Sequence, residues 1–360
     1  MHFWLAMNKV PGIGPKRFGL LIRHFGTARA VWEASAAELA AAGLSPRAVE
    51  KFLAARASIH PAAEAERALR EKLRILTLHC PDYPRLLARI PDPPPVLFVR
   101  GELRPADEVA VAVVGTRTPT PTGRLTAERL AGDLAAQGIT VVSGMARGID
   151  TAAHRGALAA GGRTIAVLGS GIDVVYPPEN LHLYEEIAGG GGAVVSEFPL
   201  GTDPLPMNFP ARNRVISGLT LGVVVIEAAS DSGSLITAAH AAEQGREVFA
   251  VPGPVELELS RGPNRLIKQG AKLVEGVRDI LEELSLPVLS HAEVATTRET
   301  GGLSADEERV LCALTHEPRH VDLIVRETGL SSAQVNAALI MLVIKGLVRE
   351  SPGSLFSRLR

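Results

Sequence analysis

The chain has 360 residues, 46% of them hydrophobic, and a formal net charge of −1. This length allows two or three domains, no apolar run reaches the length of a membrane span, and the first residues lack the order of a signal peptide. Cys80 and Cys312 lie far apart, and no histidine stands at ligand spacing from them. We therefore expect a cytoplasmic protein without a disulfide framework, metal or cofactor.

The charge is unevenly distributed along the chain. Residues 1–70 carry more Lys and Arg than Asp and Glu, residues 71–302 are slightly acidic, and residues 303–360 are balanced. If the middle of the chain binds a polyanion, it must therefore do so through a local pocket, because it has no general basic field.

Residues 1–70 are rich in alanine and are predicted to form a helical domain. Within them, Val10–Lys16 contains Gly12 and Gly14 and precedes an apolar helical pattern. This segment resembles the turn of a helix-hairpin-helix motif, in which backbone N–H groups at a helix start approach a DNA phosphate. A tight turn within a small helical bundle explains the same glycines, so both interpretations stay open.

Residues 71–285 are predicted to form the central domain. Residues 73–78 suit an edge strand, and the proline-rich segment Pro91–Pro95 leads into an apolar run at 96–100. From there strands and helices alternate, which predicts a Rossmann-like α/β fold with a doubly wound, mainly parallel sheet. The expected strands are 109–114, 139–143, 164–168, 193–196, 221–227, 247–251 and 271–274, and the expected helices include 122–137, 148–160, 180–188 and 234–244.

The turns that follow these strands are rich in glycine, hydroxyl and arginine residues. Ligands of doubly wound sheets bind at the carboxyl ends of the strands, and backbone N–H groups at helix starts favour anions. Several such turns on one edge predict an anion site more strongly than any one of them. The candidate residues are Gly115, Thr116 and Arg117, then Ser143, Gly144, Arg147 and Gly148, then Ser232, Gly233 and Ser234.

A polar block, Phe209–Gly218, stands between two apolar runs. Arg212, Asn213 and Arg214 supply hydrogen-bond donors suited to phosphate, and an aromatic face stacks on any base. Because Phe209 precedes a proline, we expect it in an extended segment and not in a helix. The alternative is that Phe209 belongs to the core and that the arginines cap a helix or pair with acids.

An enzyme acting on a nucleotide or its ribose phosphate is the main alternative. The chain has no P-loop, a partial dinucleotide fingerprint at Gly169 and Gly171 lacks its third glycine, and no serine lies in a nucleophile elbow. The acids near strand ends would either act as acids and bases or orient the arginines; they are Asp150, Asp173, Glu197 and Glu227. No nucleophile–base pair is evident from spacing, so we expect no enzyme.

Residues 286–302 read as a linker, and 303–360 as three helices followed by a β-hairpin, which is the pattern of a winged helix. The third helix, at 332–345, is poor in basic residues. This favours a role in partner contact or packing over reading of DNA. A structural adaptor that recruits partners through this domain is a third interpretation.

Together these motifs are recognisable: the chain resembles the DprA (DNA-processing protein A, or Smf) family. The resemblance covers the whole central region and is specific in combination. It is carried by Gly115–Arg117, Ser143–Asp150, Ala166–Asp173 with Tyr176 and Pro177, Phe209–Arg214, Ser232–Thr237, Val248–Gly253 and Gly262–Gly270.

The resemblance implies a Rossmann-like core that binds single-stranded DNA without sequence preference, flanked by a sterile-alpha-motif-like domain and a winged helix. It implies a homodimer that protects incoming DNA, delivers it to the RecA recombinase in natural transformation and displaces single-strand-binding protein. It also implies that Gly115–Arg117 and the turn after Gly233 hold phosphates and that Phe209 contacts a base. Some relatives carry a lysine just before that Phe, whereas this chain has Pro204–Asn208 there.

Overall fold

The structure is a computed structural model that describes residues 1–286, 304–315, 318–344, 347–351 and 355–359. The chain divides into two compact units, Met1–Leu289 and Ser290–Arg360, which are described separately. The predicted linker, 286–302, falls almost entirely outside the described residues, so the domain boundaries we derived from the sequence stay predictions. Among the described residues, no helix is long and apolar enough to span a membrane.

Six helices open the first unit and enclose an apolar cluster around Met7, Phe18, Leu21 and Phe52. Gly12, with φ of 87°, turns the chain between the first two helices, which is one of the two roles that the sequence left open. The helices are α1 (His2–Asn8), α2 (Pro15–Phe25), α3 (Ala28–Glu33), α4 (Ala36–Ala41), α5 (Pro46–Ser58) and α6 (Pro61–Arg70).

These helices also pack directly on the central sheet. Leu5 of α1 and Ala68 of α6 share a buried cluster with Phe98 of the sheet. Arg67 of α6 forms an ion pair with Asp173 at 2.8 Å. The N-terminal helices therefore have their own core but are anchored to the central fold.

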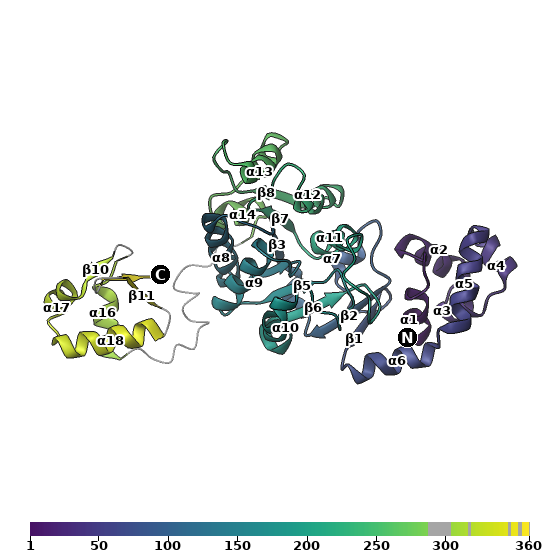
Figure 1. The fold of residues 1–360 in the computed structure, drawn as a ribbon, viewed down its shortest axis with the longest axis horizontal. Helices are drawn as coiled ribbons and strands as arrows, with labels where there is room; N and C mark the ends of the chain where they lie inside the picture. The colour runs from purple at the N-terminus through teal and green to yellow at the C-terminus, as the bar shows by residue number, and fades with distance from the viewer. Residues whose placement is uncertain (287–303, 316–317, 345–346, 352–354, 360) are drawn as a thin grey trace. The chain divides into compact units, whose positions relative to one another are not determined.

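Nine strands of the described chain form one sheet in the order β1-β2-β6-β5-β4-β3-β7-β8-β9 (Figure 1). The seven strands from β6 to β9 are parallel, whereas β1 and β2 add an antiparallel edge. This confirms the predicted sheet and edge strand. The strands are β1 (Arg74–Thr77), β2 (Val96–Gly101), β3 (Ala110–Val114), β4 (Thr140–Ser143), β5 (Thr164–Val167), β6 (Gly192–Ser196), β7 (Gly222–Val225), β8 (Glu247–Ala250) and β9 (Lys272–Leu273).

Helices cover both faces of the sheet because the strands are apolar on both sides. Ala112 of β3 faces a cluster with residues of α7, α11 and α12, whereas its neighbours Val111 and Val113 face α8, α9 and α14. The helices of this region are α7 (Arg85–Ala88), α8 (Pro121–Ala136), α9 (Ile149–Ala159), α10 (Leu181–Glu186), α11 (Asn208–Gly218), α12 (Gly233–Glu243), α13 (Glu258–Lys268) and α14 (Val277–Glu283).

The strand order reverses between β3 and β7. Strands β3 to β6 follow one another outward in one direction, and the chain then returns to place β7 on the other side of β3. In such sheets the crevice beyond the carboxyl ends of the two central strands is the usual place for a ligand. The loops after β3 and β7 therefore define where a site is expected.

Two helices of the central region differ from the sequence-based expectation. Residues 208–218, which we expected to begin with an extended segment, form α11, and residues 258–268 form α13 around an internal Pro263. Phe209 and Pro210 lie in the first turn of α11, where the N–H that proline lacks has no helical partner. The expectation of an extended Phe209 was therefore wrong.

The second unit has the helix and strand order of a winged helix, as predicted. An apolar cluster including Val310, Ile324 and Leu339 holds together the three helices that the structure describes in this unit. A three-stranded sheet in the order β10-β12-β11 accompanies them. The elements are α16 (Ala305–Cys312), β10 (Arg319–His320), α17 (Val321–Thr328), α18 (Ser332–Ile344), β11 (Val348–Ser351) and β12 (Leu355–Arg358).

Candidate nucleic-acid interface

The loop after β3 is held by Glu227, the second residue after the end of β7. The backbone N–H of Thr116 donates to the Glu227 carbonyl oxygen at 2.7 Å. Thr120 donates to the Glu227 carboxylate through its backbone N–H, at 2.9 Å, and through its hydroxyl, at 2.6 Å. Glu227 thereby fixes the loop on both sides of Arg117, whose own side chain is exposed.

The turn after β4 packs tightly against that loop. Gly148 has φ of 78°, and a Cβ at this position would lie 2.4 Å from the Thr116 carbonyl oxygen. The next residue, Ile149, donates its backbone N–H to the same oxygen at 3.2 Å. Only glycine permits both the positive φ and this approach. The predicted residues of the two turns are therefore brought together.

Buried polar groups stabilise the turn from beneath. The Asp150 carboxylate accepts backbone N–H groups of Gly144, at 3.1 Å, and Ala146, at 3.3 Å. Burial raises the pKa of Asp150, and the charge of Arg212 opposes that shift. The Ser143 hydroxyl donates to the Val113 carbonyl oxygen at 2.7 Å, so this serine joins two strands.

Met145 lies at the centre of the same turn, with φ of 58°. This left-handed conformation is uncommon for a residue with a side chain. Its N–H donates to His154 Nε2 at 3.4 Å, and its carbonyl oxygen accepts Asn180 Nδ2 at 2.9 Å. The surrounding polar side chains therefore hold the turn in a conformation that it would not adopt alone.

Arg212 is buried and binds backbone carbonyl groups, although the sequence suggested a phosphate contact. Its side chain lies beneath the turns that follow β4 and β5, where Nη1 donates to Gly144 O at 2.6 Å and to Val167 O. Only 4% of the residue is exposed, and burial lowers the pKa of the guanidinium to about 10. Its donors join α11 to the ends of β4 and β5.

Arg214 and Asn213 are also engaged inside the protein. Arg214 Nη2 forms an ion pair with Glu197 at 2.5 Å, and its Nε lies 3.4 Å from Asp92. Asn213 Nδ2 donates to Gly233 O at 3.1 Å, which ties α11 to the start of α12. The alternative of pairing with acids therefore describes Arg214, whereas Arg212 binds backbone carbonyl groups instead.

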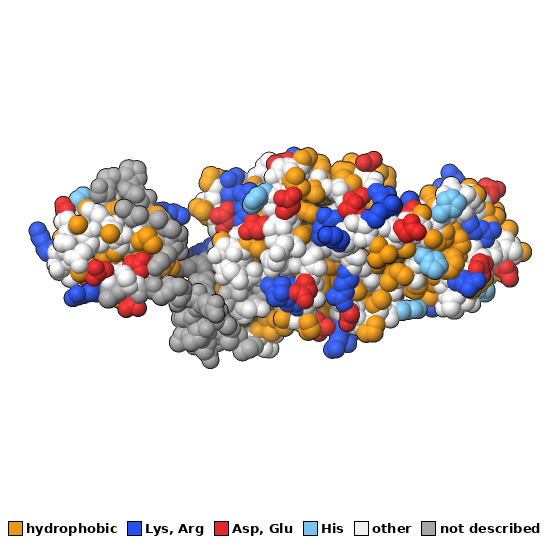
Figure 2. All heavy atoms as spheres, turned by 90° about the horizontal axis from the view of Figure 1, so that it is seen from below, with side chains coloured by type: hydrophobic (Ala, Val, Ile, Leu, Met, Phe, Trp, Pro, Cys, Tyr) orange, Lys and Arg blue, Asp and Glu red, His pale blue; other side chains and the backbone are white. Residues whose placement is uncertain are grey.

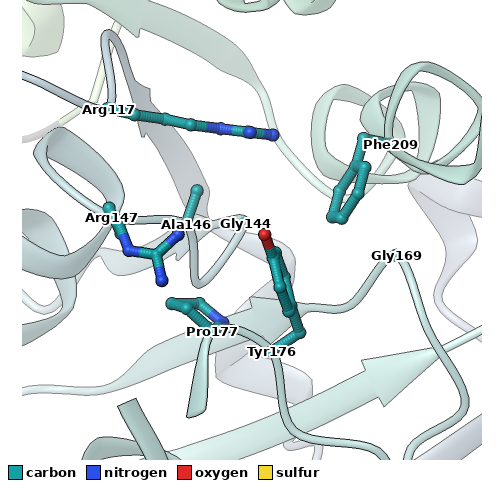
Figure 3. Close-up of a pocket in the computed structure, with 8 residues that line it drawn as sticks. All are labelled: Arg117, Gly144, Ala146, Arg147, Gly169, Tyr176, Pro177 and Phe209. Atoms are coloured by element: carbon teal, nitrogen blue, oxygen red, sulfur yellow. The ribbon is translucent and has the colours of Figure 1, made fainter. Parts of the chain in front are cut away.

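The exposed part of the site is a platform formed by Arg117, Phe209, Tyr176 and Arg147 (Figure 3). The Arg117 guanidinium lies 5.3 Å from the centre of the Phe209 ring, and the Phe209 and Tyr176 rings are 5.7 Å apart with a tilt of 47°. In Figure 3 Arg117 extends across the depression toward Phe209. The depression offers only about 10 Å³ of space to water-sized molecules.

A glycine beneath the ring positions Phe209. A Cβ on Gly169 would lie 2.8 Å from the Phe209 ring, so any side chain there would displace the ring. The ring is partly buried and partly open to solvent. Phe209 is thus fixed in direction by its helix and by this contact while keeping an accessible part.

The platform includes one residue that the sequence-based site left out, Tyr176. Tyr176 follows β5 and lies 5.9 Å from the Arg147 guanidinium, which itself pairs with Glu179. The hydrogen bonds to Glu179 and to Tyr176 raise the pKa of Arg147. An aromatic residue in a turn after a predicted strand was the available signal for Tyr176.

Ser232, Gly233 and Ser234 form the start of α12. The Ser232 hydroxyl accepts the Ser234 N–H at 3.4 Å, and Gly233 is exposed with no atom within 4 Å of a potential Cβ. The helix therefore begins with an uncovered glycine, where backbone N–H groups attract anions. The 11-residue helix and its cap match the sequence-based prediction of a helix opening here.

The four acids near strand ends all have partners. Glu197 pairs with Arg214, Asp173 with Arg67, Asp150 accepts backbone N–H groups, and Glu227 holds Thr120. His154 is fully buried with Nδ1 2.7 Å from the Thr164 hydroxyl, and burial lowers its pKa to about 3. These groups stabilise the loops.

Two family models match the chain. The model described as DNA recombination-mediator protein A matches residues 74–285, and the model described as the DprA winged helix domain matches residues 294–354.

Curated relatives and solved structures of the same family also match the chain. Protein Smf of Synechocystis sp. is 36% identical over 391 aligned positions, covering 99% of this chain and 98% of that protein. DNA processing protein DprA of Streptococcus pneumoniae is 48% identical over 201 residues, 56% of this chain and 71% of that protein. The X-ray structure of the S. pneumoniae protein matches with a TM-score of 0.70 and 37% identity, covering 79% of this chain and 98% of that one.

A structure of DNA processing protein A from Helicobacter pylori, described as giving insight into its single-stranded DNA binding mode, matches with a TM-score of 0.53 and 30% identity. It covers 59% of this chain and 96% of that one. With a family model over most of the central region and a relative aligned along nearly its full length, the chain belongs to the DprA/Smf family of DNA recombination-mediator proteins.

Proposed function

We propose that the chain binds single-stranded DNA without sequence preference at the platform of Arg117, Phe209, Tyr176 and Arg147. The observation that carries this proposal is an exposed guanidinium 5.3 Å from a fixed, partly open aromatic ring at the strand-order reversal. An aromatic face stacks on any base, and arginine binds phosphate through paired donors. The described binding of single-stranded DNA by the H. pylori relative supports the same ligand.

The size and charge of the site fit a strand better than a small substrate. The depression of about 10 Å³ is far below the roughly 300–1,000 Å³ of sites that enclose small molecules. Figure 2 shows Lys and Arg side chains in small groups interspersed with acids on the face it presents. Such a surface favours local phosphate contacts over a long electrostatic track.

The proposal has two further parts that rest on family membership. We expect the chain to act as a homodimer and to help the RecA recombinase assemble on single-stranded DNA, including DNA covered by single-strand-binding protein. We also expect Gly115–Arg117 and the start of α12 to hold phosphates. The family description as a recombination mediator supports the first part, and the open Gly233 supports the second.

The deciding experiment is fluorescence anisotropy with labelled oligo-dT, duplex DNA and mononucleotide competitors over a salt series. We expect oligo-dT to bind much more tightly than duplex and mononucleotides to compete poorly. Tight mononucleotide binding with chemical turnover would instead support a nucleotide enzyme. Recombinase assembly on oligo-dT coated with single-strand-binding protein, with and without this chain, tests the mediator role.

A further inference from the structure

A second, larger groove lies within the first unit, between α2 and the proline-rich segment Pro91–Pro95. Its volume is about 400 Å³, and Trp4 contributes to its lining. This volume is within the roughly 300–1,000 Å³ of sites that hold small organic groups. The groove is therefore large enough for a nucleobase, which the shallow platform cannot enclose.

Aromatic side chains line the groove. The Trp4 and His79 rings are 5.1 Å apart at 71°, and Trp4 lies 5.0 Å from Phe18. His79 is exposed and Trp4 is partly buried. The groove thus offers aromatic surface for stacking next to a rigid proline segment.

The α2 wall of the groove is positively charged. Lys16 and Arg23 are exposed, and neither pairs with an acid in the part of the chain that the structure describes. The acid that lines the groove, Asp92, already lies 3.4 Å from Arg214. Two unpaired cations flanking aromatic surface suit a base together with its phosphates.

Gly19 of α2 lines the groove without a side chain of its own. Within a helix, glycine is less stable than alanine. A Cβ here would meet only Arg23 Nη1, at 3.4 Å, so no backbone contact requires this glycine. Its missing side chain leaves space between α2 and the proline segment.

The groove is adjacent to the helix that carries the platform ring. Asp92 in the groove wall contacts Arg214 of α11, and Phe209 lies five residues earlier on that helix. Five residues of helix span only about 7.5 Å. We propose that this groove binds an unstacked base and adjacent phosphates of the single strand whose other part occupies the platform. This inference rests on the proposed function.

The chain carries its own reporter for this site. It has two tryptophans, Trp4 in the groove and Trp32, which is 7% exposed in the helical bundle. We expect oligo-dT to quench the fluorescence of the full-length chain and the Trp4→Phe variant to lose that quenching. An unquenched chain saturated with oligo-dT, or quenching that persists in Trp4→Phe, overturns the proposal.

Gly19→Leu fills the groove without touching the platform. We expect it to keep the unfolding midpoint, since leucine suits a helix better than glycine, and to weaken long oligo-dT binding roughly tenfold, the value of one stacked base. The double variant Lys16→Ala with Arg23→Ala alters only exposed side chains. It should reduce the dependence of the binding constant on salt concentration by the contribution of about two phosphate contacts. Unchanged affinity and slope in both variants overturn the proposal.

A parallel titration of Arg117→Ala separates the two sites. If Arg117→Ala binds normally while Gly19→Leu is impaired, the platform proposal fails and so does the placing of one strand across both sites, whereas base binding in the groove stands. If Arg117→Ala is impaired and the groove variants bind and quench normally, the groove proposal fails and the platform stands.

Discussion

Two arginines beside the same ring show that burial decides the role of a residue. The guanidinium groups of Arg117 and Arg212 lie 5.3 and 5.9 Å from the centre of Phe209. Arg117 is exposed, whereas Arg212 is 4% exposed and donates to carbonyl groups of two turns. A phosphate can reach the first guanidinium, while the second supports the surface on which the first lies.

Arg117→Ala is expected to weaken binding of all single-stranded sequences alike. It should also reduce the dependence of the binding constant on salt concentration by the contribution of about one phosphate contact, because one charge contact is lost. The measurement is oligo-dT anisotropy over a salt series. Arg129→Ala, an exposed arginine in the middle of α8, is the matched control and should leave the slope unchanged. A folded Arg117→Ala protein with the wild-type slope would show that Arg117 does not contact phosphate.

Phe209→Ala is expected to cost roughly 1–3 kcal/mol of oligo-dT binding without changing the salt slope, because stacking is lost and no phosphate contact changes. Phe209→Trp should retain most of the affinity. Gly169→Ala should mimic Phe209→Ala, since a Cβ there would lie 2.8 Å from the ring.

Thermal unfolding of the same variants distinguishes stacking from packing at Phe209. If Phe209 were a core residue, its truncation to alanine would lower the free energy of unfolding by about 3–5 kcal/mol. Because Phe209 is only partly buried, we expect a smaller loss. If the folded fraction of Phe209→Ala binds oligo-dT normally, the ring does not stack on DNA.

At the scale of elements, the β4–α9 turn depends on a neutral histidine. His154 Nε2 accepts the Met145 N–H, while Nδ1 lies 2.7 Å from the Thr164 hydroxyl, which itself donates to Val141 O. This pattern requires a proton on Nδ1 and none on Nε2. Protonating Nε2 would place two donors against each other at the strained Met145.

The free energy of unfolding is therefore expected to decrease as the pH is lowered. Burial lowers the pKa of His154 from 6.5 to about 3, so below pH 6.5 the unfolded chain binds a proton that the folded chain does not. The stability from the neutral ring is complete above pH 6.5 and is lost by up to about 1.4 kcal/mol per pH unit as pH falls toward 3. Denaturant unfolding between pH 7 and 4 measures this.

A His154→Gln variant is the control for this slope. Asp150 acts in the opposite sense, because its pKa is raised by burial and its protonation favours the folded chain at low pH. The difference between wild type and His154→Gln removes that contribution. Equal slopes in the two proteins would show that His154 does not set the acid sensitivity.

Sequence patterns predicted elements well where an apolar period exists. The strands around Val111 and Val141 and the helix between them were predicted because their apolar residues repeat at the expected spacing. The helix at 208–218 was not, since its buried side includes Arg212, Asn213, Arg214 and Ser217. A helix that buries polar groups against carbonyl groups carries no apolar stripe, so pattern reasoning could not find it.

The candidate site was predictable in place but not in detail. Turns after strands located the edge, and Gly148 and Arg117 do meet there. Which arginine is exposed depends on the path of α11 beneath the turns, a long-range packing outcome that local sequence does not encode. The same holds for the groove beside Trp4, which requires α2 and the segment Pro91–Pro95 to face each other.

At the scale of the whole molecule, the two units differ in what they offer DNA. The first carries an exposed arginine–aromatic platform, whereas α18 of the second, Ser332–Ile344, contains no Lys or Arg. A DNA-reading helix usually has basic residues for phosphate contacts. The polar residues of α18, including Gln334 and Asn336, are exposed but uncharged.

Deletion of residues 303–360 is therefore expected to leave oligo-dT affinity within about tenfold of the full chain, or 1.4 kcal/mol. The first unit has its own buried clusters, and the winged helix has a separate one, so the truncated chain retains the core on which the platform depends. Anisotropy on both proteins, with light scattering to compare their oligomeric states, measures the difference. A loss beyond tenfold in a truncation with an unchanged oligomeric state would assign the winged helix a direct share of DNA binding. The platform alone would then be too weak to hold the strand, and the phosphate contacts of the second unit would have to come from its other elements, because α18 offers no cation.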